Sequence, residues 1–420
     1  MKFKDLIAKF FLYDKKFKVI KGSLDNVKQD NTVLFVVDSG WNTIEYTIPC
    51  LYYLKKHHPY LNIVIFMPEV SIWLKYKEER KIAKLMEDIS SCIIVNTSVK
   101  DNWFKYKIWR LRKSVLERKT IEYFLKDAKF SVVLRTDLLT KTVQCIYQYH
   151  PHAKHIVQPH GAFLGVVCPE NLEKKALGPG DFWVMPDETW PNYFEGGIDN
   201  SVLTGAPQLD SWWIESVYND ELQLFVHQLN SSKKNILVLL PLLQDDFRLS
   251  KSDQGVLFRV LNTYKGRLNF IFKFHPRELY KDKKIFLEKY GFSEYKDDMF
   301  IVDLPTEVVS AVADCVICAG ESSASANALI NDVPVIEFYT TLLLPCYYKI
   351  AKDKYVSALV KNGVVMYADT YDSLMLSINS VLCGSGWKKF SNKYKKYIVS
   401  DGMASCRMAD VVLKALHINN

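Results

Sequence analysis

The sequence predicts an α/β protein of two domains, each with a parallel β-sheet covered by helices. Short apolar runs typical of strands recur along the whole chain and are separated by amphipathic or polar stretches. The runs are apolar throughout instead of alternating with polar residues, which indicates strands buried on both faces of a parallel sheet. With 420 residues, 49% of them hydrophobic and 24% charged, the chain has the length and composition of a two-domain globular protein.

The first half is predicted to form one such domain, over residues 1–230. Its strands are expected at Thr32–Val37, Asn62–Phe66, Cys92–Val95, Ser131–Leu134, His155–Val157 and Phe182–Met185. Between the first two strands, Ile44–His57 is amphipathic and long enough for a crossover helix. Gln208–Leu229 is a second helix candidate, and the polar residues 230–234 after it indicate a linker.

A second α/β unit is predicted over residues 231–385. Its strands are expected at Asn235–Leu240, Leu268–Phe272, Met299–Val302, Cys315–Cys318, Val333–Phe338 and Gly363–Tyr367. We expect residues 386–420 to form a helical segment that packs back on the N-terminal domain. Open α/β sheets bind ligands at the carboxyl ends of their strands. The cleft between the two domains is therefore the predicted binding site.

The net charge is +8, and the excess of lysine is concentrated near the two ends of the chain. Met1–Lys21 and Trp387–Tyr397 interleave lysines with aromatic and aliphatic residues, which favours an anionic membrane surface over nucleic acid as a partner. Plain amphipathic surface helices are the alternative. No run approaches the roughly 18 apolar residues of a membrane span, and the N-terminal stretch does not fit a signal peptide. We expect a cytoplasmic protein, peripheral at the inner face of the membrane.

Cysteine and acidic motifs predict neither a metal nor a resident cofactor. The nine cysteines are scattered, several of them inside apolar runs, which is typical of reduced core thiols. Cys315 and Cys318 form a C-x-x-C pair, but no second pair completes a zinc site. The chain contains no Asp-x-Asp triplet, no phosphate-binding loop of the G-x-x-x-x-G-K-[ST] type and no G-x-G-x-x-G fingerprint. Any phosphate group must then be held by His, Lys, Arg and backbone N–H groups.

A histidine turn at the end of the strand Leu268–Phe272 is the first candidate for such a phosphate site. His275 is flanked by two cations, Lys273 and Arg277, and Pro276 follows it in the turn. A histidine with cationic neighbours at a strand's carboxyl end can hold a phosphate by hydrogen bonds and charge. The alternative is an ordinary His-Pro turn.

A serine turn is the second candidate. Gly320, Glu321, Ser322 and Ser323 follow the strand Cys315–Cys318 and lead into a helical stretch. Small residues and hydroxyls at such a turn suit an anion, because the first N–H groups of a helix lack partners. A simple helix cap is the alternative. Two phosphate-competent turns in one α/β unit indicate a donor that carries a nucleotide monophosphate or diphosphate.

The Lys-Phe-His-Pro-Arg-Glu turn and the Ser-Ser turn, followed by Asp332–Val335, resemble bacterial GT-B glycosyltransferases. Closest in motif style are the sialyltransferases, polysialyltransferases and Kdo transferases that use CMP-activated sugars. Wall-polymer enzymes that use CDP-glycerol carry a similar pair of turns. The resemblance covers about residues 235–345 and only isolated turns of the first domain.

This resemblance implies a role for each residue of the two turns. His275, Ser322 and Ser323 would grip the phosphate and cytidine of the donor, with Lys273 or Arg277 assisting. Glu321 and Glu337, on the next strand, are candidate contacts to the ribose or the base. The transfer is expected to need no metal ion.

The catalytic base has two candidates. Gln158–Gly161 follows the strand His155–Val157, and His160 within it can take a proton at neutral pH because its ordinary pKa is about 6.5. The CMP-sugar families tend to have an acidic pair before this glycine, whereas the CDP-glycerol enzymes resemble this chain in having His-Gly. Asp245 and Asp246 are the second candidate, with loop solvation or helix capping as the alternative.

The expected reaction is transfer of a sialic acid or Kdo type of sugar from a CMP-activated donor to a hydroxyl of a bacterial surface glycan or glycolipid. A capsule, a lipopolysaccharide or a lipooligosaccharide would be the product. Three alternatives stay open: a CDP-polyol phosphotransferase, a UDP-sugar transferase or 2-epimerase, and a non-enzymatic glycan-binding protein.

Overall fold

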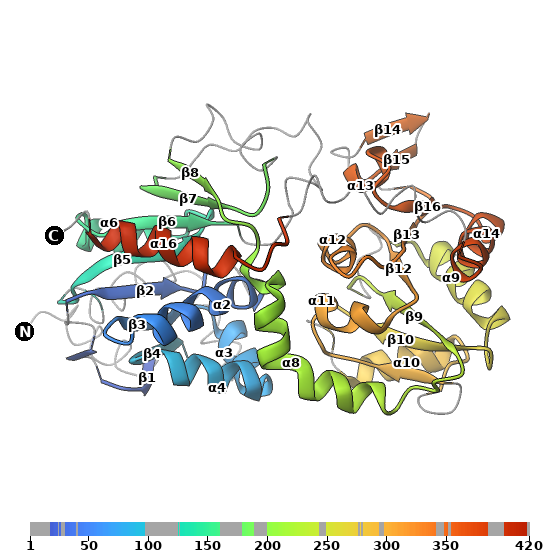
Figure 1. Cartoon of the computed structure of the whole chain (residues 1–420), viewed down its shortest axis with the longest axis horizontal. Coiled ribbons are helices and arrows are strands. Elements are labelled where there is room, and N and C mark those ends of the chain that lie inside the picture. Colours follow the sequence, from blue (N-terminus) through green and yellow to red (C-terminus); the bar gives the residue numbers. More distant parts are fainter. Residues whose placement is uncertain are drawn as a thin grey trace, which may run out of the picture.

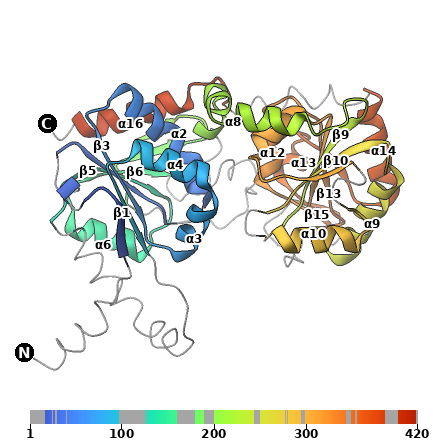
Figure 2. The same cartoon turned by 90° about the horizontal axis from the view of Figure 1, so that it is seen from below.

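The computed structural model describes residues 17–23, 25–26, 30–38, 41–96, 125, 127–159, 179–188, 200–242, 249–275, 278, 280–293, 298–341, 348–351, 354–384 and 399–417. Within these residues the chain forms two α/β domains that lie side by side (Figure 1). Helices cover both faces of each sheet, as the view from below shows (Figure 2). The predicted fold class is confirmed.

The first domain is built on an eight-stranded sheet in the described part of the chain. Its strands are β1 (Phe17–Lys21), β2 (Thr32–Val36), β3 (Asn62–Met67), β4 (Cys92–Asn96), β5 (Phe130–Thr136), β6 (Lys154–Gln158), β7 (Phe182–Met185) and β8 (Ser201–Leu203). The strand order is β1-β4-β3-β2-β5-β6-β7-β8. Strands β2, β3 and β4 are buried at every residue, as their unbroken apolar runs predicted.

The edge strand β1 differs from the sequence-based expectation. Phe17–Lys21 belongs to the stretch that was expected to lie in a membrane interface, but here it pairs antiparallel with β4. Its side chains are only partly buried after Phe17, as expected of an edge strand. The remainder of that stretch, residues 1–16, and the lysine-rich residues 387–397 lie outside the described residues.

The helices of the first domain connect its parallel strands. They are α2 (Trp41–His57), α3 (Val70–Glu78), α4 (Arg80–Ile89) and α6 (Lys141–Tyr149). α2 begins earlier than predicted, at Trp41, and its last turn carries three basic side chains that suit the negative end of the helix dipole. Thr140 caps α6 by accepting a hydrogen bond from the Val143 N–H at 3.3 Å.

The second domain contains a six-stranded sheet, parallel at every pairing. Its strands are β9 (Lys234–Leu239), β10 (Leu268–Lys273), β11 (Met299–Ile301), β12 (Cys315–Ala319), β13 (Val335–Phe338) and β16 (Met366–Ala368), in the order β11-β10-β9-β12-β13-β16. β16 begins later than predicted, because Gly363 has a left-handed φ of 61° in the turn before it.

Six helices of the second domain lie within the described residues. They are α9 (Lys251–Thr263), α10 (Tyr280–Lys289), α11 (Thr306–Val309), α12 (Ser323–Leu329), α13 (Ala358–Lys361) and α14 (Tyr371–Leu382). A two-stranded hairpin, β14 (Tyr348–Ala351) with β15 (Lys354–Val356), was not predicted and lies beyond the carboxyl end of β13.

Two helices join distant parts of the chain. The predicted helix Gln208–Leu229 is split into a 3₁₀ turn, η3 (Pro207–Leu209), and α8 (Ser211–Val226), which extends from the first domain to the second (Figure 1). The C-terminal helix α16 (Ala404–His417) packs on α2. The buried Asp210 carboxylate accepts hydrogen bonds from the Ala404 and Ser405 N–H groups at 3.0 and 2.7 Å. Asp210 therefore caps α16 at the point where α8 begins.

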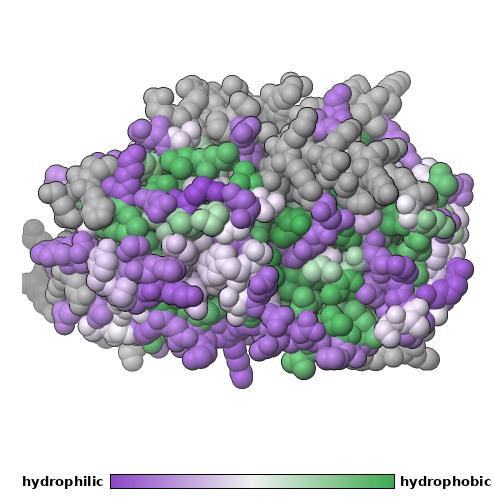
Figure 3. Space-filling view, in the orientation of Figure 1, coloured by the Kyte–Doolittle hydropathy of each residue, from purple (hydrophilic) through white to green (hydrophobic). Residues whose placement is uncertain are grey.

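The described residues carry no sign of a membrane span or a disulfide. No helix among them is long and apolar enough to cross a bilayer. Five of the cysteines that the structure describes are buried with free thiols, including Cys315 and Cys318 within β12. The face seen in Figure 3 mixes apolar and polar side chains over both domains.

Candidate functional site

A cavity of about 450 Å³ lies between the two domains. The first domain contributes the start of α2 with Trp41 and Glu45, and parts of α3 and α4. Helix α8 lines one side, and the second domain contributes Lys273 and Phe274 at the end of β10 and residues 301–305 after β11. The carboxyl edge of the second sheet thus faces the start of α2.

Lys273, which was predicted to assist in phosphate binding, lies among carboxylates. It lines the interdomain cavity together with Glu45. Burial and, to a lesser extent, the charge of Glu307 raise the pKa of Glu45 to about 7, while the charge of Lys273 acts against this rise. Burial likewise lowers the pKa of Lys273, while Glu45 and Glu307 raise it. Lys273 is therefore one member of an electrostatic cluster that joins the two domains.

His275 follows this cluster at the carboxyl end of β10. Its side chain is half-buried, and its carbonyl accepts a hydrogen bond from the Glu278 N–H at 3.0 Å, which closes the predicted turn. Pro276 and Arg277 lie outside the described residues. The structure therefore supports the position of the histidine at a strand end, where open α/β sheets bind ligands.

The serine turn lies at the end of β12. Gly320 has a φ of 86°, a left-handed conformation that favours glycine and turns the chain away from the strand. The Ser322 hydroxyl accepts a hydrogen bond from the Ala324 N–H at 3.2 Å and so caps α12. Ser322 and Ser323 are half-buried, whereas Glu321 is almost fully buried. The hydroxyl proton of Ser322 is left to donate to a ligand or to water.

Strand order places β9 between the two turns. β10 and β12 both pair with β9, so His275 and Ser322 lie at the same edge of the sheet on either side of it. Neighbouring strands are about 4.8 Å apart, which puts the two strand ends about 10 Å from each other. The intervening loop after β9 carries Asp245 and Asp246, which lie outside the described residues. His160, after β6, lies outside them as well.

Glu337 is part of a buried polar network that was only partly foreseen. Its Oε2 atom accepts hydrogen bonds from the Ser357 hydroxyl at 2.7 Å and the Tyr339 hydroxyl at 3.1 Å. The Tyr339 oxygen in turn accepts from the Ser357 N–H at 3.0 Å. Burial raises the pKa of Glu337 to about 8, and the nearby charge of Glu321 contributes to this rise. Glu337 is fully buried, so a contact to a ribose would require access that this conformation does not provide.

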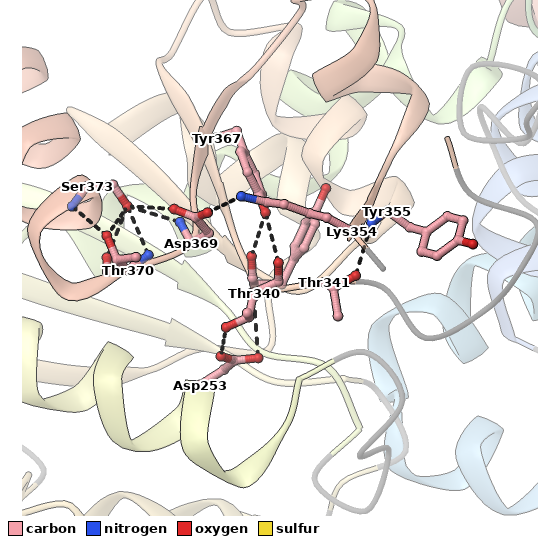
Figure 4. Close-up of polar contacts among 10 residues, drawn as sticks. Asp253, Thr340, Thr341, Lys354, Tyr355, Tyr367, Asp369, Thr370 and Ser373 are labelled. Atoms are coloured by element: carbon pink, nitrogen blue, oxygen red, sulfur yellow. Dashed lines mark hydrogen bonds and ion pairs between the residues drawn. The ribbon is translucent and has the colours of Figure 1, made fainter. Parts of the chain in front are cut away.

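A second network fastens the end of β13 to its surroundings (Figure 4). The Thr340 hydroxyl donates to Asp253 in the first turn of α9. The Tyr367 hydroxyl donates to the Tyr339 and Thr340 carbonyls, both at 3.1 Å, and the Tyr355 N–H donates to the Thr341 hydroxyl at 3.0 Å. These contacts hold α9, β15 and β16 around one strand end. Nothing in the sequence indicated them, because the partners are far apart along the chain.

The edge of the first sheet contains a carboxylate held by hydroxyls. Asp38, directly after β2, is 7% exposed. Its Oδ1 accepts a hydrogen bond from the Thr136 hydroxyl at 2.7 Å, and its Oδ2 accepts one from the Thr140 hydroxyl at 3.5 Å. Burial raises the pKa of Asp38 to about 6, against the Thr136 hydrogen bond and the charge of Arg135. Asp38 was not among the predicted catalytic residues, although an acid soon after a wholly apolar strand was a usable signal.

Next to it, Arg135 is a fully buried cation whose described partners are neutral. It donates to the Thr136 carbonyl at 2.7 Å, to the Tyr147 hydroxyl at 3.3 Å and to the Pro179 carbonyl. The Tyr147 ring stacks on His155 with centroids 3.6 Å apart. Burial and the charge of Arg135 lower the pKa of His155 to about 3, so this histidine is neutral.

Comparison with solved structures shows the architecture. A UDP-GlcNAc 2-epimerase from Neisseria meningitidis bound to UDP-GlcNAc is similar with a TM-score of 0.57 and 12% identity, over 92% of this chain and 100% of that chain. A histidine-to-asparagine variant of the wall teichoic acid polymerase TagF, soaked with CDPG, has a TM-score of 0.58 and 15% identity, over 99% and 96%. A further UDP-N-acetylglucosamine 2-epimerase has a TM-score of 0.56 and 12% identity, over 92% and 96%.

No protein-family model matches the chain, and no curated protein sequence is significantly similar to it. At 12–15% identity the structural likeness shows the fold alone. The fold is GT-B: two parallel-sheet α/β domains with the carboxyl edge of the second sheet facing the first domain.

Proposed function

We propose that this chain transfers a sugar of the sialic acid or Kdo kind from a CMP-activated donor to a hydroxyl of a bacterial surface glycan or glycolipid. The observation that carries the proposal is the pair of turns on either side of β9, with the His275 ring on one and the Ser322 hydroxyl on the other. Two hydrogen-bonding groups about 10 Å apart at one sheet edge suit the phosphate and the nucleoside of one donor.

The structural neighbours support a nucleotide-linked substrate. One of them was solved with UDP-GlcNAc and another with CDPG, so the same fold accommodates such ligands in those proteins. In this chain, His275 and the Ser322–Ser323 turn would stabilise the charge on the departing phosphate. Arg277 would assist, and Pro276 would shape the turn. Because Lys273 interacts with Glu45 and Glu307, its proposed role is to hold the two domains together around the reactants.

The acceptor hydroxyl must lose a proton, and the sequence offers His160, then Asp246 and Asp245, as bases. A base that acts directly on the acceptor gives inversion at the anomeric carbon. The acceptor would reach the cleft from the first-domain side. The lysine-rich ends of the chain are proposed to keep the enzyme near an anionic membrane surface, where a glycolipid acceptor would lie.

Transfer of a polyol phosphate from a CDP-linked donor is the second candidate function. The similarity to TagF over 99% of this chain favours it, as does the His160–Gly161 pair that resembles the CDP-glycerol enzymes. The two candidates differ in the bond that breaks: at the sugar carbon in the first, and within the diphosphate in the second. CMP therefore leaves in both reactions, and the two candidates differ in the donor that must bind: a CMP-linked sugar in the first and a CDP-linked polyol in the second.

A calorimetric titration with CMP, CDP, UDP and GDP, without added metal, tests the proposal. We expect CMP to bind most tightly and His275→Ala to abolish its binding without lowering the melting temperature. His152→Ala, which changes an exposed histidine of the first domain, serves as the matched control and should bind as the wild type does.

Each other outcome points elsewhere. Preference for CDP would favour the polyol-phosphate transferase, and preference for UDP would favour a hexose transferase or an epimerase. A large loss of melting temperature in His275→Ala with CMP binding intact would make this histidine structural. Binding of none of the four nucleotides would refute the enzyme assignment.

A further inference from the structure

Asp38 lies at the position in the first sheet where open α/β folds bind their ligands. Strands β3 and β4 extend the sheet on one side of β2, and β5, β6 and β7 extend it on the other. The direction of the strand order therefore reverses between β2 and β5. Asp38 follows β2, and Thr136 is the last residue of β5, so both lie at the carboxyl ends of the two strands that flank this switch point.

This edge of the first sheet lies close to the second domain. Three residues after Asp38, Trp41 begins α2 and lines the interdomain cavity. Lys273 and Phe274 line the same cavity from the end of β10, immediately before His275. The loop that carries Asp38 and the turn that carries His275 therefore both adjoin the interface between the domains.

The hydrogen bonds around Asp38 favour the ionised form of its carboxylate, which accepts protons. The Thr136 hydroxyl oxygen accepts from the Leu138 N–H at 3.4 Å, and the Thr140 hydroxyl oxygen accepts from the Val143 N–H at 3.3 Å. Each hydroxyl therefore directs its own proton to one carboxylate oxygen of Asp38. Each oxygen of a carboxylate has two lone pairs, so both keep capacity for a further hydrogen bond.

A purely structural role would usually give a buried aspartate a cationic partner. Among the residues that the structure describes, no lysine or arginine nitrogen forms an ion pair with Asp38. Arg135 acts on it only at longer range, because the guanidinium donates to carbonyls and a hydroxyl. Burial together with these weak opposing effects places the pKa of Asp38 at about 6. A group with such a pKa is ionised at neutral pH and still accepts a proton at low cost.

We propose that Asp38 is a catalytic residue, the general base that takes the proton from the acceptor hydroxyl. The proposal rests on the proposed transfer reaction and assigns its base to a described residue. In the step, the acceptor oxygen forms a bond to the anomeric carbon of the donor. The bond from that carbon to the phosphate oxygen breaks, and its electron pair stays on the released CMP. The acceptor proton moves to a carboxylate oxygen of Asp38 and then to solvent.

Release of CMP from CMP-N-acetylneuraminate, CMP-Kdo and CDP-glycerol, with water as the acceptor, tests this assignment without an identified glycan. We expect Asp38→Asn to slow the release by about 10²–10⁴-fold and to leave CMP binding intact. The matched control is Asp181→Asn at the opposite edge of the same sheet. The Asp181 carboxylate accepts from the His155 N–H at 2.8 Å, and this variant should keep full turnover.

A pH profile separates a catalytic from a structural role. The wild-type profile of kcat/KM should fall below about pH 6 as Asp38 becomes protonated. Thr136→Val removes a hydrogen bond that lowers the pKa of Asp38, so this limb should move to higher pH. If the fall of kcat/KM at low pH occurs at the same pH in Thr136→Val as in the wild type, the proposal is overturned. This test holds even if Asp38→Asn fails to fold.

The remaining outcomes are also decisive. Full turnover in Asp38→Asn, with loss of turnover in His160→Ala, would assign the base to His160. This result would overturn the proposal for Asp38 and would leave the transferase proposal standing. A wild-type protein that binds CMP but releases it from none of the three donors would refute the transferase proposal and this one with it.

Discussion

Asp38 and Glu337 are buried carboxyl groups near strand ends, one in each domain, yet their protonation states at neutral pH differ. Asp38 follows β2 and Glu337 lies near the end of β13. Burial raises the pKa of both, to about 6 for Asp38 and about 8 for Glu337. At pH 7 Asp38 is therefore ionised and Glu337 is protonated.

Burial is the largest cause of both rises, and the charges nearby act on the two pKa values in opposite directions. Asp38 has the cation Arg135 within range, which lowers its pKa. Glu337 has a second acid, Glu321, as its neighbour, which raises its pKa. Pairs of acids whose surroundings separate their pKa values commonly take separate acid and base roles. Here the ionised acid lies at the edge of the first sheet, and the neutral acid stabilises the edge of the second.

The largest expected effect concerns Glu337 and its two hydroxyl partners. Glu337→Ala leaves the Ser357 and Tyr339 hydroxyls without their acceptor and opens a cavity, so it should cost about 3 kcal/mol in the free energy of unfolding. Glu337→Gln, which resembles the neutral acid, should cost less than about 1 kcal/mol. Urea unfolding of the wild type and the two variants at about pH 4, where the acid is largely protonated in both the folded and the unfolded chain, checks this. Equal costs would mean that the acid is ionised in the native state.

The pH dependence of stability should separate the two acids. Both acids have a higher pKa in the folded chain than in the unfolded chain. As pH rises from the unfolded pKa to the folded pKa, the unfolded chain is favoured because only there does the acid ionise freely. Over that range the wild type therefore loses stability relative to a variant with a neutral side chain. Between pH 6 and 8 the wild type should lose about 2 kcal/mol relative to Glu337→Gln. Relative to Asp38→Asn, the wild type should lose less than about 0.5 kcal/mol of stability between pH 6 and 8. The folded pKa of Asp38 is about 6, so most of its loss of stability occurs below this interval.

Urea unfolding at pH 6, 7 and 8 of the wild type and the two variants provides the measurement. Similar changes for the two variants would show that the environments of Asp38 and Glu337 do not differ as the structure indicates.

The sequence predicted the buried strands well, for a physical reason. Strands such as β2 are covered on both faces, so their apolar runs are visible in the sequence alone. The edge strand β1 was missed, because only one of its sides pairs with a described neighbour and Lys18 and Lys21 interrupt its apolar residues. The hairpin of β14 and β15 was missed too, since its stability depends on contacts such as Tyr355 with Thr341.

The candidate site could be predicted only in part. His275 and Ser322 follow apolar strands, so their places at the ends of β10 and β12 could be inferred locally. That β9 lies between these strands could not, because strand order is decided by packing across the whole domain. For the same reason the sequence could not show that Lys273 interacts electrostatically with Glu45, which comes from the other domain.

The smallest predicted effect is the coupling between Asp38 and its two threonines. In a double-mutant cycle on unfolding free energy, Asp38→Ala and Thr136→Val should couple by about 1 kcal/mol, because the two side chains share a 2.7 Å hydrogen bond to a charged group. Thr140→Ala removes a helix cap in both backgrounds, so that cost cancels. Its coupling to Asp38→Ala should be below about 0.5 kcal/mol because the 3.5 Å contact is weak.

Thr136→Val combined with Glu337→Gln is the control for this cycle. The two residues lie in different domains and share no partner among the described contacts, so their effects should add to within about 0.5 kcal/mol. Coupling in this control as large as in the Asp38 cycle would mean that the Asp38 cycle does not report the direct contact between Asp38 and Thr136. A larger coupling for Thr140 than for Thr136 would instead reverse the roles of the two hydroxyls, and Thr140 would then be the residue that holds the ionised carboxylate in place.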